Sequence, residues 1–93
     1  MIEAILDNAD FSETKLEKAT FTNASLQNAN FSNAKLIETS LRKANMSNAD
    51  FSEARFQNVN LSEATLDGAV FSGAILEGTN LDKAASSNDI KMQ

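Results

Sequence analysis

A five-residue period in the large apolar side chains restricts the possible folds of this chain more than any other feature. The series of every fifth position, starting at residue 1, contains all six Phe, all nine Leu, Met1 and Met46. Thirteen of the fourteen Ala lie two residues before a position of this series. The unit Ala-polar-(Leu or Phe)-polar-polar runs from Ala4 to Lys83 in sixteen copies without an insertion. Because an α-helix repeats every 3.6 residues and a strand every 2, the period predicts a chain that turns one corner per repeat.

The central residues also indicate how many corners close one circuit. Central residues that are twenty positions apart form four columns. One of these columns is uniformly aromatic, with Phe11, Phe31, Phe51 and Phe71. A circuit of twenty residues would stack these rings at strand spacing, whereas circuits of fifteen or twenty-five would scatter them. We therefore predict an all-β, four-sided parallel β-helix of about four 20-residue coils. Its structural core is expected to consist of Leu6, Phe11, Leu16, Phe21, Leu26, Phe31, Leu36, Leu41, Met46, Phe51, Phe56, Leu61, Leu66, Phe71, Leu76 and Leu81.

The second residue after each central position is expected to form the corner. It is Asn or Gly in nine of sixteen repeats, and both residues tolerate the positive φ that a type II turn requires. The remaining corners carry long charged side chains, so the sequence predicts a different turn type there. These corners are Glu13, Lys18, Glu38, Lys43, Glu53, Glu63 and Lys83.

Composition excludes most routes to catalysis. The chain has no His, Cys, Trp or Tyr, so thiolate chemistry, imidazole acid/base chemistry and the common zinc sites are ruled out. Carboxylates such as Asp50 and Glu53 would lie on a convex solenoid without a pocket to shift their pKa values. We therefore predict no enzyme activity, no catalytic residues, no metal and no cofactor. A net charge of -5 also argues against direct binding of nucleic acid.

The two ends of the chain lead to predictions about location and assembly. The N-terminal segment has neither a basic region nor a continuous apolar stretch, and no apolar run is long enough to span a membrane, so a cytoplasmic protein that does not contact membranes is expected. We expect the repeats to fill residues 1–85 and a tail to follow at 86–93. That tail could cover the last coil with Ile90 and Met92; alternatively, a homodimer could form through the C-terminal coil at Leu76 and Leu81.

Stacked coils also align the outward side chains into ladders. The positions before one column of central residues form an aspartate ladder of Asp10, Asn30, Asp50 and Val70, with Glu13 and Glu53 at its corner. The next side carries Lys15, Lys35 and Arg55, which we call the basic strip. These residues are the candidate interaction surface. The basic strip could bind an acidic partner, or it could be a solvated face balanced by Glu17 and Glu38.

Several segments resemble the pentapeptide-repeat family: Ala-Asp-Phe-Ser-Glu at 9–13 and 49–53, Ala-Asn-Phe-Ser-Asn at 29–33, and Ala-Thr-Leu-Asp-Gly at 64–68. The resemblance covers about nine-tenths of the chain and implies a right-handed quadrilateral β-helix. Two functions are then possible. The chain could be a rigid interaction or structural module whose protein partner is unknown, or, like the Qnr and MfpA-like members, a dimeric DNA mimic that protects a type II topoisomerase such as DNA gyrase. Unlike Qnr, this chain has four coils and no interrupting loop.

Overall fold

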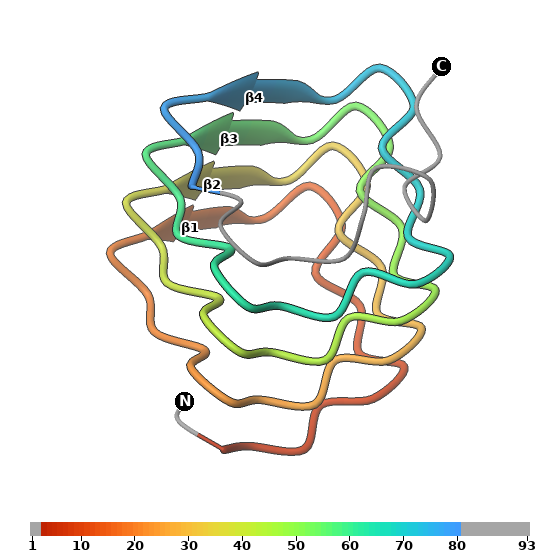
Figure 1. Cartoon of the computed structure of the whole chain (residues 1–93). Coiled ribbons are helices and arrows are strands. Elements are labelled where there is room, and N and C mark those ends of the chain that lie inside the picture. The colour runs from red at the N-terminus through yellow and green to blue at the C-terminus, as the bar shows by residue number, and fades with distance from the viewer. Residues whose placement is uncertain (1–2, 81–93) are drawn as a thin grey trace.

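The chain winds into four stacked coils with all of its strands on one side (Figure 1). This computed structural model describes residues 3–80. The strands pair in parallel in the order β1-β2-β3-β4, and each residue pairs with the one twenty positions later, as in Leu16↔Leu36. The predicted all-β solenoid with a 20-residue coil is therefore confirmed. The strands are β1 (Lys15–Glu17), β2 (Lys35–Ile37), β3 (Arg55–Gln57) and β4 (Ile75–Glu77).

The other three sides are joined by the same twenty-residue register. Isolated parallel bridges connect Asp10 with Asn30 and Ser25 with Asn45, among others. The backbone N–H of an outward residue donates to the preceding coil, and that of the following central residue donates to the next coil, as Phe31 N does to Asp50 O at 2.6 Å. Every side of the rod therefore contributes hydrogen bonds between coils, and a coil obtains them only from its neighbours.

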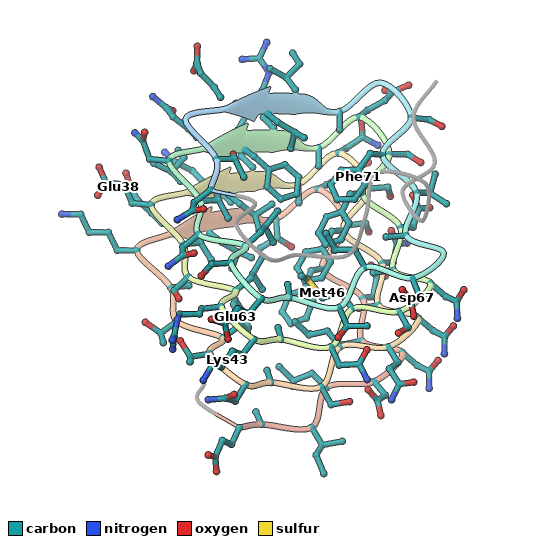
Figure 2. The ribbon with its side chains drawn as sticks, in the orientation of Figure 1. Glu38, Lys43, Met46, Glu63, Asp67 and Phe71 are labelled. Carbon is teal, nitrogen blue, oxygen red and sulfur yellow. The ribbon has the colours of Figure 1, made fainter. Side chains whose placement is uncertain are left out.

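The Phe column lies inside the coils as one continuous stack. Ring centroids are 5.0 Å apart for Phe11 and Phe31, 4.9 Å for Phe31 and Phe51, and 5.0 Å for Phe51 and Phe71, with interplanar angles of 9° to 17°. Figure 2 shows Met46 and Phe71 within the coils. These contacts fix twenty residues as the length of one circuit.

Burial of the core declines toward the two ends of the described rod. The central residues from Phe21 to Phe71 are buried, whereas Leu6, Phe11, Leu16 and Leu76 are only partly buried. At the N-terminal end Ile5 is 80% exposed. The partly buried core residues thus lie in the first coil and at the end of the last described one, whereas Leu66 and Phe71 of that last coil remain fully buried. Leu81, the last predicted core residue, lies outside the described residues.

The prediction that charged corners differ from Asn and Gly corners is wrong for Glu13, Lys43, Glu53 and Glu63, which form the same turn. Lys18 and Glu38 do form a different turn, but so do Asn58 and Gly78, so charge is not the reason. Lys83 lies outside the described residues. Backbone φ is positive at every corner from residue 3 to residue 78, including 60° at Glu13 and 57° at Glu53. The Glu53 corner also has the turn hydrogen bond found at Asn corners, from Ala54 N to Phe51 O at 3.0 Å. A left-handed residue costs roughly 1–2 kcal/mol, and hydrogen bonds between coils, such as Glu53 N to Ser72 O at 2.7 Å, offset this cost.

The position of a corner around the circuit, rather than its residue, decides which turn forms. The corners that follow β1–β4 lack the turn hydrogen bond within residues 3–80, because an extended strand leads into them. In this column Thr39, Val59 and Thr79 replace Ala at the small inward position, which Ala19 keeps in the first coil. Thr39, which is 1% exposed, satisfies its hydroxyl there by donating to Leu16 O at 3.2 Å. The corners of this column are Lys18, Glu38, Asn58 and Gly78.

Candidate functional site

The aspartate ladder lies in register on one side of the rod, with Asp10 bridged to Asn30 and Asp50 bridged to both Asn30 and Val70. Its polar side chains bond to their own coil. Oδ1 of Asp50 accepts hydrogen bonds from the backbone N–H of Ser52 at 2.9 Å and from its hydroxyl at 2.6 Å. Oδ1 of Asp50 therefore closes a local turn rather than extending freely into solvent.

Asp10 and Asn30 repeat this turn. Asp10 accepts from the N–H of Ser12 at 2.9 Å and from its hydroxyl at 2.6 Å, and Asn30 accepts from the N–H of Ser32 at 2.9 Å. The Ser12 hydroxyl and then its N–H hold the pKa of Asp10 below its ordinary value of 3.8, because both bonds favour the charged carboxylate. The same turn occurs on other sides at Asn45 and Asn60.

The two glutamates next to this ladder do not add a continuous acidic edge. Glu13 and Glu53 occupy exposed corners in the same column, but Asn33 stands between them in the intervening coil. Within the aspartate ladder, Asn30 likewise separates the two carboxylates. The four predicted acidic residues therefore lie on alternate coils, so the negative charge on this face is intermittent.

The basic strip is continuous across three coils. Lys15 pairs with Lys35 across β1 and β2, and Lys35 pairs with Arg55 across β2 and β3, so all three outward side chains lie in one row. All three are exposed. Ile37 and Gln57 line a shallow hollow of about 180 Å³ together with these three cations.

These cations have no ion-pair partner within residues 3–80. The ion pair found there joins Lys43 to Glu63 at 3.8 Å, on another side of the rod, where both side chains point outward (Figure 2). The column next to the basic strip carries Glu17 and Glu77 at its two ends. Positive charge is therefore concentrated beside the hollow, at Lys35 and Arg55.

The predicted end and dimer contacts can be located only in part. Leu76 lies in β4 and is partly buried against the core. Leu81, Ile90 and Met92 lie outside the described residues, as does the whole tail at 86–93. The boundary at residue 85 and the C-terminal dimer remain predictions.

No arrangement for metal binding or membrane insertion is found in the described part of the chain. Residues 3–80 contain no cluster of three or more His, Cys, Asp or Glu side chains that could hold a metal ion. The same residues form no helix of the length and apolarity needed to cross a membrane. The outward side chains instead offer charge and hydrogen-bonding groups on a convex surface, which can bind a partner by complementarity.

The profile of the pentapeptide repeat region matches residues 4–88. The chain belongs to the pentapeptide-repeat family. No curated protein matches the sequence. A solved pentapeptide-repeat protein, Rfr23 from the cyanobacterium Cyanothece 51142, superposes with a TM-score of 0.94 and 30% identity, over 100% of this chain and 63% of that one. This chain thus spans less than two thirds of that relative.

Two further pentapeptide-repeat structures are similar in fold. The protein alr5209 from Nostoc Pcc 7120 gives a TM-score of 0.81 at 24% identity, over 92% of this chain and 86% of that one. QnrB1, a plasmid-mediated fluoroquinolone resistance protein, gives 0.53 at 19% identity, over 90% and 59%. The right hand expected for the family fits the high superposition with Rfr23, because a coil of opposite hand would not superpose.

Proposed function

We propose that this pentapeptide-repeat protein is a non-catalytic, rigid interaction module that binds an acidic protein partner through the basic strip. The observation that carries the proposal is the uninterrupted row of Lys15, Lys35 and Arg55, which has no acidic partner within residues 3–80. Like charges at this spacing repel each other by up to about 1 kcal/mol per pair in water, and an acidic partner would relieve that repulsion. The repeats hold the row in place before the partner binds.

Poly-L-glutamate is a direct probe for this function. We expect the labelled polymer to bind the full chain at low salt and to bind the Arg55→Glu variant about fivefold more weakly, since an attractive contact becomes a repulsive one. Arg42→Glu is the matched control, because Arg42 is also an exposed arginine but lies on another side of the rod. Absence of binding, or equal weakening by both variants, would refute the proposed function.

A second candidate is the dimeric DNA mimic that protects DNA gyrase. It is supported by the net charge of -5 and by the fold shared with QnrB1, whose 19% identity shows the fold alone. The alternation of Asp10 and Asp50 with Asn30 argues against it, since duplex DNA carries one charge per ~1.7 Å of axis. A gyrase supercoiling assay with a quinolone separates the two: protection lost in Asp50→Asn would favour mimicry, and no protection would leave the interaction module.

The proposal extends to two expectations from the sequence. An interaction module needs neither a catalytic group nor a cofactor, and we propose that this chain has neither. We also propose that it acts in the cytoplasm, where fractionation of cells that produce the tagged natural protein should recover it. Recovery from a membrane or secreted fraction would contradict this location.

A further inference from the structure

The coil spacing sets the positions at which a partner must place its charges. Adjacent coils are 4.9–5.0 Å apart along the stacked Phe rings. Because β1, β2 and β3 pair residue for residue, Lys15, Lys35 and Arg55 follow the same spacing. The three cations therefore stand at 0, about 5 and about 10 Å along the rod axis.

An α-helix lying along the rod meets this spacing, whereas an extended peptide does not. With a rise of about 1.5 Å per residue, helix positions i, i+3 and i+7 stand at about 0, 4.5 and 10.5 Å and share one face. In an extended strand, alternate residues face one way and stand at about 0, 6.7 and 13.4 Å, so the third charge is misplaced by more than 3 Å. Three simultaneous charge contacts thus favour a helical partner.

Apolar residues next to the basic strip indicate that the partner helix also carries an apolar side chain. Ile75 continues the row by one coil through its pairing with Arg55, and its side chain is 51% exposed. Position i+10 of the same helix stands about 15 Å along its axis, level with Ile75. Beside the row, Ile37 lines the hollow of about 180 Å³. An apolar side chain at i+10 would cover Ile75, where a fourth acidic residue would find no cation.

We propose that the partner presents an acidic, amphipathic α-helix that lies along the rod axis across β1 to β4. Its carboxylates at i, i+3 and i+7 contact Lys15, Lys35 and Arg55, and its apolar residue at i+10 contacts Ile75. This inference rests on the proposed function and adds the conformation and residue pattern of the partner. The glutamates at the ends of the neighbouring column, Glu17 and Glu77, repel a helix displaced to that side.

Three labelled Ala/Gln peptides of about 21 residues test the inference, since Ala-rich chains of this length form helices in water. The first carries Glu at i, i+3 and i+7 and Leu at i+10. The second has the same composition with the Glu residues spread around the helix. The third keeps the first pattern but has two central Pro substitutions that break the helix. Circular dichroism checks helicity, and fluorescence anisotropy at low salt measures binding.

We expect the first peptide to bind about tenfold more tightly than the other two, because only its charges meet all three cations together. Arg55→Glu should remove that preference and Arg42→Glu should keep it. Ile75→Ser should weaken the first peptide about threefold through lost apolar contact and leave poly-L-glutamate binding unchanged.

The outcomes separate the two proposals. Equal binding of all three peptides, with poly-L-glutamate still dependent on Arg55, would overturn the helical partner and leave the proposed function intact. Equal binding of the first and third peptides alone would also overturn the helix. If neither the peptides nor poly-L-glutamate bind, the proposed function fails, and the inference fails with it.

Discussion

In the aspartate ladder, the side chains of Asp10, Asn30 and Asp50 turn back to accept hydrogen bonds from serines two residues later. In the basic strip, Lys15 and Arg55 extend from paired strands and form no ion pair with residues 3–80. Both rows occupy the outward position directly before the central residue of each repeat. A row of polar side chains in this fold can therefore either stabilise the coils or remain available to a partner, and local hydrogen bonding decides which.

Removal of each whole row should give the largest contrast. We expect the triple variant Asp10→Ala, Asn30→Ala and Asp50→Ala to lose a substantial part of its unfolding free energy, because each of the three side chains accepts at least one turn hydrogen bond. Alanine at Lys15, Lys35 and Arg55 should change it by less than about 0.5 kcal/mol, since it also removes repulsion between like charges. Urea unfolding followed by circular dichroism measures the unfolding free energy of both variants. Equal losses would mean that the two rows contribute equally to stability.

A single position can show that the hydrogen bond, rather than the charge, matters in the aspartate ladder. Asp50→Ala should cost about 1–1.5 kcal/mol, whereas Asp50→Asn should cost under about 0.5 kcal/mol because an amide oxygen makes the same turn at Asn30. The measurement is again the free energy of urea unfolding. If Asn and Ala are equally destabilising, charge rather than turn closure is responsible.

The ladder can also be extended. Val70 occupies the fourth position of the aspartate ladder, two residues before Ser72. Its side chain has no oxygen that could accept a hydrogen bond from Ser72. Val70→Asn should therefore stabilise the chain by about 0.5 kcal/mol through an added turn hydrogen bond. Val70→Ala, which adds no side-chain oxygen, is the control and should not raise the thermal midpoint. A lower midpoint for Val70→Asn would show that apolar packing at this site outweighs the turn.

The smallest effect should appear in acid. The folded-state pKa of Asp10 lies below its ordinary value, so its contribution to stability is complete above that value and disappears as the pH falls through the lowered pKa. Wild type should therefore lose stability relative to Asp10→Asn as the solution is acidified. Thermal midpoints of both proteins across the acid range measure this difference. A constant difference at all pH values would mean that the carboxylate and its hydrogen bonds add no pH dependence.

Much of the fold could be predicted because packing inside a narrow rod leaves few alternatives. Only one circuit length brings Phe11, Phe31 and Phe51 over one another, and the same register aligns the basic strip. The corners were harder, since residue preference suggested that Glu53 would differ from Asn48, yet closure of the circuit imposes positive φ on both.

Two further structural features, the Asx turns and the side without turn hydrogen bonds, have sequence patterns outside the central positions. The Asx-x-Ser spacing of Asp10 and Ser12 is typical of an Asx turn and could have identified the ladder as a structural feature. Thr39, Val59 and Thr79 share one column and mark the side that lacks the turn bond. That Arg55 forms no ion pair within residues 3–80 depends on side-chain geometry, which the sequence does not specify.

The uninterrupted twenty-residue register has a consequence for how such a surface can change. Inserting one extra five-residue unit between Lys15 and Lys35 would advance all later residues by a quarter turn around the axis. The interior of the rod would still be filled by Leu, Phe or Met, but Lys15 and Lys35 would then lie on different sides. Gain or loss of a single unit can therefore assemble or dismantle a row of outward charges in one step, without any substitution and without a new fold.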